Sequence, residues 1–205
     1  TGVYSYAKTA AAIEALDADE SGSDTFTVTV TDGDGALVTK TFTVGVTGAD
    51  DAPTLASVSA GTISEDDQSN TTTDSGLSGT LAGADVDIET LTYGIDGGTA
   101  GEGVVTKAGT YGTLTVNTST GVYSYAKTAA AIEALDAGES GSDAFTVTVT
   151  DGDGSVVSQT YTVSVTGADD APTLASVSAG TIVEVTQSSS TTDTNLSGTL
   201  AGADV

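Results

Sequence analysis

The most constraining feature of this sequence is an internal repeat. Residues 1–86 recur without insertion or deletion as residues 120–205, so the period is about 119 residues and about 71 of the 86 aligned positions are identical. Such fidelity indicates recent duplication and a function that depends on the number of units, as in a stalk, a spacer or a multivalent surface. The sequence therefore favours a structural array over a chain built around one active site.

The repeat also predicts where the domains begin and end. The sequence Asp-Asp-Ala-Pro occurs at 50–53 and again at 169–172, and it contains the only two prolines. Because proline disfavours helix before it and cannot donate to a strand ladder, each tetrapeptide is interpreted as a linker. We expect one complete domain at 51–169, the C-terminal part of a preceding repeat at 1–50 and the N-terminal part of a following repeat at 170–205. A domain of about 119 residues is large enough to bury a core unaided.

Composition excludes several classes of function. The formal net charge is −25, with four Lys, no Arg, no His and no Cys. Nucleic acid is excluded as a partner because phosphate binding needs a basic surface, and no apolar run is long enough for direct membrane insertion. Nucleophilic catalysis lacks a histidine base, so we predict that the chain is not an enzyme. The absence of Cys rules out a disulfide framework.

The pattern of apolar residues predicts an all-β domain. The segments 26–31 and 145–150 alternate apolar and β-prone polar residues, which is typical of half-buried strands. The second of them meets Asp151-Gly152-Asp153-Gly154 and a further alternating run at 157–165, which predicts a β-hairpin. Further short strands are predicted at 55–59, 77–82, 89–95, 111–116 and 122–125. The seven strands predicted within the complete domain at 51–169 favour a two-sheet Greek-key β-sandwich, with one short helix at 127–136 connecting strands.

Almost every carboxylate lies outside these predicted strands. If the strands alternate in direction, the loop Asp85-Val86-Asp87, the turn 151–154 and the linker Asp50-Asp51 meet at the N-terminal end of the domain. Glu65 precedes the second predicted strand and reaches that end only if the first strand region doubles back, so it ranks lower. The alternative interpretation is that these acids are ordinary solvated loop residues.

Converging carboxylates repel one another by about 1 to 4 kcal/mol per close pair unless a cation lies between them. Ca²⁺ takes six to eight oxygen ligands, whereas Zn²⁺, Cu and Fe favour the His and Cys that this chain lacks. Acids retained in both copies are the better candidates, which excludes Asp19, Asp66 and Asp67. The predicted calcium ligands are Asp50, Asp51, Asp85, Asp87, Asp151, Asp153, Asp169, Asp170, Asp204, Glu65 and Glu184.

Several segments of the complete repeat resemble a known family. They are Asp85-Val86-Asp87, then 109–116, 120–125, 131–135 and 143–154, closed by Asp170-Ala171-Pro172. Together they resemble the VCBS repeat, found in very large surface proteins of Gram-negative bacteria, many of them RTX-type adhesins exported by type I secretion. The resemblance implies an extracellular cadherin-like or Ig-like sandwich that serves as an extender, usually with calcium near the domain junctions. This chain has Asp50 and Asp169 where the family often has asparagine.

These observations predict a non-catalytic extender of a bacterial cell-surface adhesin, stiffened by calcium where neighbouring repeats meet. Two alternatives stay open. One is a multivalent module that binds cell-surface or biofilm-matrix polysaccharide, whose signature would be exposed aromatic side chains. The other is a structural unit of an extracellular filament that exchanges strands between chains.

Overall fold

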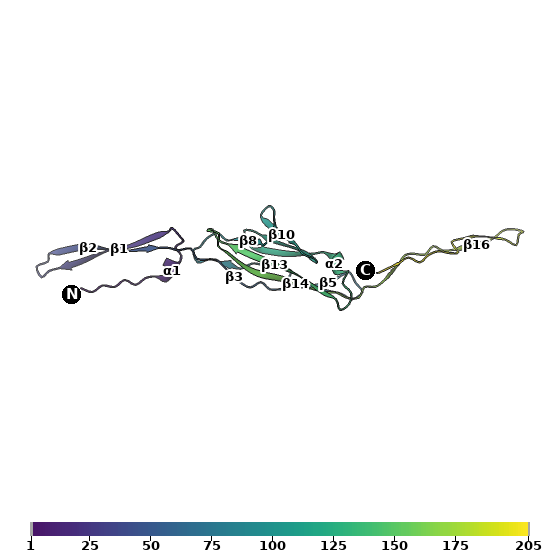
Figure 1. Cartoon of the computed structure of the whole chain (residues 1–205), viewed down its shortest axis with the longest axis horizontal. Helices are drawn as coiled ribbons and strands as arrows, with labels where there is room; N and C mark the ends of the chain where they lie inside the picture. Colours follow the sequence, from purple (N-terminus) through teal and green to yellow (C-terminus); the bar gives the residue numbers. More distant parts are fainter. Residues whose placement is uncertain (1, 205) are drawn as a thin grey trace.

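The computed structural model describes residues 2–204 and shows an elongated molecule with three parts in line (Figure 1). The N-terminal part contains helix α1 (Ala10–Glu14) and one hairpin, β1 (Ser21–Thr31) with β2 (Leu37–Thr47). A β-sandwich occupies the centre. The C-terminal part is an extended segment with β15 (Thr173–Leu174) paired to β18 (Gly202–Ala203) and β16 (Thr181–Glu184) paired to β17 (Thr191–Thr194).

The central sandwich has two five-stranded sheets. The first sheet has the order β6 (Ser78–Thr80), β12 (Val122–Lys127), β11 (Gly112–Asn117), β10 (Val104–Ala108), β9 (Thr99–Ala100). The second has the order β5 (Thr72–Ser75), β4 (Gly61–Glu65), β14 (Val156–Thr166), β13 (Ser140–Thr150), β8 (Thr92–Ile95). Strands β3 (Thr54–Leu55) and β7 (Gly83–Ala84) form a small separate pair, and helix α2 (Ala129–Ile132) follows β12. Strand β13 returns beside β8 after β9 to β12 have formed the other sheet, a Greek-key type of connection.

The core lies between the two sheets and is made of alternate strand residues. Strands β13 and β14 bury Phe145, Val147, Val149, Tyr161, Val163 and Val165, and the facing sheet contributes Leu114, Val116, Tyr123 and Tyr125. Ile132 of α2 closes one end and is 1 % exposed. The predicted all-β sandwich is confirmed, since alternation with a period of two places one side of each strand in this core.

The outward positions of the long strands carry no charge. Along β13 and β14 they are Ser, Thr, Ala and Val, and the register sets Thr146 opposite Thr160 and Thr148 opposite Ser158. The equivalent hairpin β1–β2 pairs Thr27 with Thr41 and Thr29 with Thr39 in the same way. In a chain with a net charge of −25, these neutral faces leave the acids to the loops, the turns and the ends of the sandwich.

Three parts of the secondary-structure prediction differ from the structure. The helix predicted at 127–136 is a single turn, because Lys127 still belongs to β12. The strand predicted at 55–59 reduces to Thr54–Leu55. Strands β4, β5, β9 and β10 were not predicted. Strand β4 was missed because Glu65 occupies one of its three inward positions and interrupts the apolar alternation.

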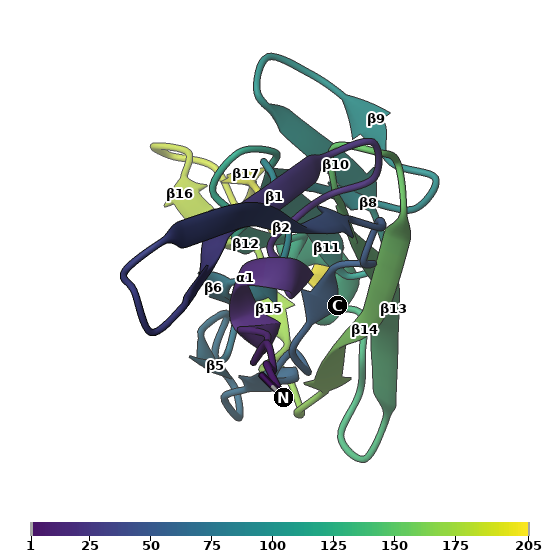
Figure 2. The same cartoon turned by 90° about the vertical axis from the view of Figure 1, so that its left-hand side faces the viewer.

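Strand β4 also changes the predicted topology. It pairs in parallel with β14, Gly61 to Ser64 lying opposite Val163 to Thr166, so the sheet is not formed by strands of simply alternating direction. Both strands therefore end at the same end of the sandwich, beside the outgoing linker. We call this end the C-terminal pole, and the end that faces α1 and the β1–β2 hairpin the N-terminal pole. Figure 2 views the molecule along its length, with the β9–β10 hairpin projecting beyond the other strands.

Candidate functional site

The N-terminal pole gathers acids from four separate segments. Asp17 comes from the loop after α1, Asp50 from the incoming linker, Asp87 and Glu89 from the loop between β7 and β8, and Asp151 from the turn between β13 and β14. Strand directions explain the meeting, because β7 ends, β8 begins and the β13–β14 turn projects at this one pole. The structure thus brings together the two predicted acidic loops and the linker.

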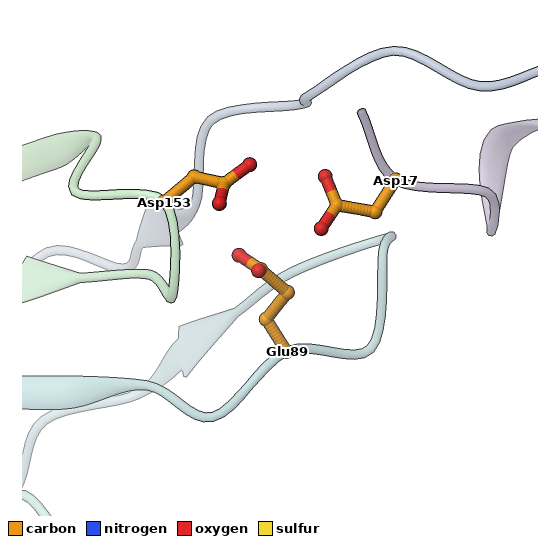
Figure 3. A group of neighbouring side chains, drawn as sticks. All are labelled: Asp17, Glu89 and Asp153. Atoms are coloured by element: carbon orange, nitrogen blue, oxygen red, sulfur yellow. The ribbon is translucent and has the colours of Figure 1, made fainter. Parts of the chain in front are cut away.

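Three groups of these acids each have one carboxylate oxygen per residue within 4.8 Å of the others. The groups are Asp17–Asp50–Asp87, Asp50–Glu89–Asp151 and Asp17–Glu89–Asp153. Figure 3 shows the last group, in which three carboxylates from the N-terminal part and from two loops of the sandwich point toward one another. Shared members link the three groups into one acidic cluster across the junction.

Hydrogen bonds hold three carboxylates of the N-terminal pole in fixed orientations. Asp151 Oδ1 accepts from the backbone N–H groups of Gly154 and Ser155, both at 2.7 Å. Asp87 Oδ2 accepts from the N–H of Asp51 at 2.7 Å, and Asp85 Oδ1 accepts from the N–H of Asp87 at 2.9 Å. One oxygen of each of these three carboxylates therefore stabilises local structure: the turn for Asp151, the incoming linker for Asp87 and the loop for Asp85.

The second oxygens of the same three carboxylates have no partner. Asp85 Oδ2, Asp87 Oδ1 and Asp151 Oδ2 are buried without a hydrogen bond within the described residues, and Asp87 and Asp151 are only 8 % and 5 % exposed. An unsatisfied buried polar atom costs about 1–3 kcal/mol, and more when it is charged. Oriented oxygens that lack donors suit an oxygen-seeking cation, so the residues fit Ca²⁺.

Repulsion between neighbouring carboxylates contributes to the raised pKa values of Glu89 and Asp153. The N–H of Gly152, which donates to Glu89 Oε2 at 2.9 Å, lowers the pKa of Glu89, but partial burial and the charges of Asp17, Asp153 and Asp151 outweigh this and raise it above its ordinary value. The charge on Asp17 raises the pKa of Asp153, with smaller contributions from partial burial and Asp50. Both pKa values are therefore raised in part by the like charges that surround these two carboxylates.

Ile88 stands between two of these acids in an uncommon conformation. Its φ is 62°, in the left-handed region that β-branched residues avoid, and its side chain is 82 % exposed. The turn that it makes carries Asp87 and Glu89 into different groups of the cluster. Such strain is tolerated where the surrounding structure fixes a functional loop.

A smaller acidic group lies at the C-terminal pole. Glu65 at the end of β4, Glu133 after α2 and Asp170 of the outgoing linker have carboxylate oxygens within 4.8 Å of one another. Glu65 is 6 % exposed; its Oε2 accepts from the N–H of Ala168 at 3.0 Å, while Oε1 is buried without a partner among the described residues. Partial burial, then the charges of Glu65 and Asp170, raise the pKa of Glu133. Glu65 thus lies at the pole opposite the one considered for it from the sequence, because β4 runs parallel to β14.

Five of the predicted ligands lie outside these groups. Asp51 and Asp85 lie at the N-terminal pole and take part in its backbone hydrogen bonds, but their carboxylates belong to none of the groups. Asp169 lies in the outgoing linker, Glu184 ends β16 and Asp204 follows β18. None of the three belongs to a group of acids within residues 2–204. They are the repeat counterparts of Asp50, Glu65 and Asp85.

Sequence reasoning missed Asp17, Glu89 and Glu133. Glu133 fell inside the helix predicted at 127–136, Asp17 is the repeat counterpart of its last residue, Asp136, and Glu89 was placed in the strand predicted at 89–95. The signal was present for two of them, because Asp17 matches Asp136 and Glu133 matches Glu14 in the other copy. Glu89 continues the alternate acids of Asp85 and Asp87 by one step.

The complete repeat matches a known protein family. The model of the bacterial cadherin-like domain matches residues 50–167, which is more than half of the chain. This chain belongs to the bacterial cadherin-like family. A search of curated proteins found no match.

Bacterial cadherin-like domains are typically extracellular and non-catalytic structural modules. Between residues 2 and 204, no helix is both long and apolar enough to cross a membrane. In this cadherin-like domain the grouped carboxylates lie at the two poles, and the uncharged outward faces of the long strands lie between them.

Proposed function

We propose that this chain is part of a non-catalytic extender of a bacterial surface adhesin, and that Ca²⁺ stiffens the junctions between its repeats. One observation carries the proposal. All four side-chain oxygens that are buried without a hydrogen-bond partner in residues 2–204 belong to carboxylates at the two poles, where the linkers enter and leave. The resemblance to VCBS repeats supports the adhesin context.

The residues that would hold a cation at the N-terminal pole come from both sides of the junction. Asp17 belongs to the preceding repeat, Asp50 to the linker, and Asp87, Glu89 and Asp151 to the sandwich. When bound, Ca²⁺ supplies positive charge that these oxygens share. Asp87 and Asp151 are already oriented by backbone donors, so the linker and the loop after α1 are the parts that become restricted.

Without a cation, the same residues favour a looser junction. Carboxylates within 4.8 Å repel by about 1 to 4 kcal/mol per pair, which favours separation of Asp17 and Asp50 from the sandwich. The linker can lower this repulsion by bending, whereas the loops of the sandwich are fixed by their hydrogen bonds. The proposed stiffening is therefore electrostatic.

Asp151→Asn tests the proposal with little change to the fold. The amide keeps an Oδ1 that accepts from Gly154 and Ser155, but it replaces the unpartnered Oδ2 with an NH₂ group. We expect calcium to increase the maximum dimension of the native chain in small-angle scattering, reversibly with chelator. In Asp151→Asn the calcium midpoint should rise about tenfold or more, a loss of about 1.4 kcal/mol.

Asp32→Asn is the matched control. Asp32 Oδ1 accepts from Asp34 and Ala36 in the equivalent turn between β1 and β2, but Asp32 belongs to none of the described acidic groups. This variant should titrate like the native chain. A native scattering profile that does not respond to calcium would contradict the proposal.

The polysaccharide-binding alternative would need exposed aromatic side chains, and four of the aromatic residues of the complete repeat are not available for it. Tyr123, Tyr125, Phe145 and Tyr161 are buried in the core of the complete repeat, at most 6 % exposed. Rings in this position cannot stack on a sugar.

A further inference from the structure

The geometry points to Gln68 as a positioning residue that seats the outgoing linker on the C-terminal pole of its own domain. This inference rests on the proposed role of the junctions, but the contacts that carry it involve no cation. Gln68 lies in the turn between β4 and β5, about a hundred residues before the linker that it contacts.

Three consecutive linker residues are anchored to the sandwich. The N–H of Gly167 donates to the carbonyl of Glu139 at 3.0 Å, and the N–H of Ala168 donates to Glu65 Oε2 at 3.0 Å. The carbonyl of Asp169 accepts from the N–H of Gln68 at 2.6 Å, and Asp169 Oδ2 accepts from Gln68 Nε2 at 3.5 Å. Gln68 thus makes the last anchor before the chain reaches Asp170.

The backbone of Gln68 explains how it presents its N–H. Its φ is 55°, in the left-handed region, which turns the amide out of the β4–β5 turn toward the linker. Gly, Asn and Asp are favoured in this conformation, and Gln is not. A residue poorly suited to the turn therefore occupies it, and its longer side chain reaches Asp169.

The duplicated turn supports a specific requirement for glutamine. Gln187 has the same left-handed backbone, with a φ of 60°. Four neighbours of Gln68 differ between the copies: Asp66, Asp67, Asn70 and Thr71 are replaced by Val185, Thr186, Ser189 and Ser190. Glutamine is retained while most of the turn around it has changed, which the turn geometry alone does not demand.

The contact between Gln68 and the linker also fixes the position of Asp169. Asp169 is the repeat counterpart of Asp50, which belongs to two of the three groups at the N-terminal pole. By holding both the carbonyl and the carboxylate of Asp169, Gln68 fixes the direction in which the linker leaves before the next repeat contributes its own acids. The linker then loses less conformational entropy when the junction forms.

Amide hydrogen exchange in excess chelator tests the backbone bond within the native chain. Gln187 is a reference of the same residue type and nearly the same φ, in a turn whose backbone contacts within residues 2–204 do not include a linker. We expect the Gln68 amide to exchange at least about tenfold more slowly than the Gln187 amide. Equal rates would overturn the inference.

Gln68→Asn tests the side chain and separates positioning from turn stability. Asn suits a left-handed backbone better than Gln but is one methylene shorter, so the turn should be at least as stable while the contact with Asp169 Oδ2 is lost. We expect the hydrogen-bonded amides of Gly167 and Ala168 to exchange several-fold faster in this variant and to be unchanged in Gln187→Asn. Unchanged linker amides in Gln68→Asn would overturn the role of the side chain.

The two proposals fail separately. Fast exchange of the linker amides in chelator would contradict the role of Gln68, and it would not affect the calcium titration by scattering. If the linker amides are protected in chelator and the scattering profile does not change with calcium, Gln68 still anchors the linker and the calcium mechanism is contradicted.

Discussion

At the scale of single residues, the buried carboxylates are of two kinds that differ in how many oxygens are hydrogen bonded. Both oxygens of Asp143 are satisfied, by the N–H groups of Thr110 (2.7 Å) and Tyr111 (3.0 Å) and by the hydroxyl of Tyr125 (2.6 Å). Burial, then the bond to Asp143, raises the pKa of Tyr125, which keeps this hydroxyl a donor. Glu65, Asp87 and Asp151 each keep one buried oxygen without a partner. Asp143 is thus structural, whereas the other three are suited to binding.

Replacing Asp143 with Ala should destabilise the sandwich strongly. The change leaves two backbone donors and one hydroxyl inside the protein without an acceptor, so we expect the free energy of unfolding to fall by about 3 kcal/mol. Asp24→Ala is the control, because Asp24 is the repeat counterpart and accepts from Tyr6, but in an exposed setting. It should change stability by less than about 0.5 kcal/mol in urea titrations. Similar losses in both variants would refute the distinction.

At the scale of elements, the hairpin β13–β14 was predictable and the β4–β14 pairing was not. Strict alternation around Asp-Gly-Asp-Gly marks the hairpin in the sequence, and the register follows from the turn. Strand β4 offers only Ile63 as a large apolar residue, because Gly61 and Glu65 take the other inward positions. Its partner lies about a hundred residues away in the sequence, so no local pattern indicates the pairing.

The loop after α2 and the start of the linker are packed too closely for a side chain at Gly167. A Cβ there would overlap the backbone carbonyl of Leu135, and the equivalent Gly48 would overlap that of Leu16. We expect Gly167→Ala to lower the free energy of unfolding by about 1–3 kcal/mol and to increase hydrogen exchange in the linker.

Gly101→Ala is the control for this overlap. Its Cβ would meet nothing closer than 3.6 Å, in an exposed turn of the same sandwich. This variant should be within about 0.5 kcal/mol of the native protein. A Gly167→Ala variant as stable as Gly101→Ala would show that the linker start is not held by the Leu135 loop.

At the scale of the whole molecule, the grouped acidic residues and the uncharged strand faces occupy different positions along the long axis. The outer faces of the long strands carry hydroxyls and small apolar groups, while the acids concentrate at the junctions between the parts seen in Figure 1. One ion pair, Lys127 with Asp74 at 2.6 Å, links β12 to β5 across the two sheets. The long strands of the sandwich thus present uncharged faces between two acidic poles.

Removal of calcium should therefore destabilise the chain in a way that monovalent salt reverses only in part. With calcium at roughly thirtyfold excess over its Kd, we expect the free energy of unfolding to rise by about 2 kcal/mol relative to chelator. Sodium chloride screens repulsion between exposed acids but does not supply ligands to the buried oxygens of Asp87 and Asp151. Thermal unfolding in chelator, with and without added salt, measures the difference; full recovery by salt would show that simple screening suffices.

The sequence alone determined the repeat and the sandwich, and it marked the carboxylates near the linkers as candidate ligands. A duplicated period, alternation of apolar residues and the absence of His and Cys are local or compositional properties, and they are read directly. Thus Asp85, Asp87, Asp151 and the linker acids were candidates before the fold was known, and strand direction alone was enough to place them at one pole.

Only the tertiary structure decided which acids meet and which oxygens remain open. Asp17 and Glu89 join the cluster because a loop of one repeat reaches two loops of the next, and Glu65 moves to the opposite pole because β4 runs parallel to β14. Hydrogen bonding in turns and linkers then uses one oxygen of Glu65, Asp85, Asp87 and Asp151, and within residues 2–204 it leaves the other without a partner. Such contacts depend on segments distant in sequence, and a pattern along the chain carries no information about the distance between them in space.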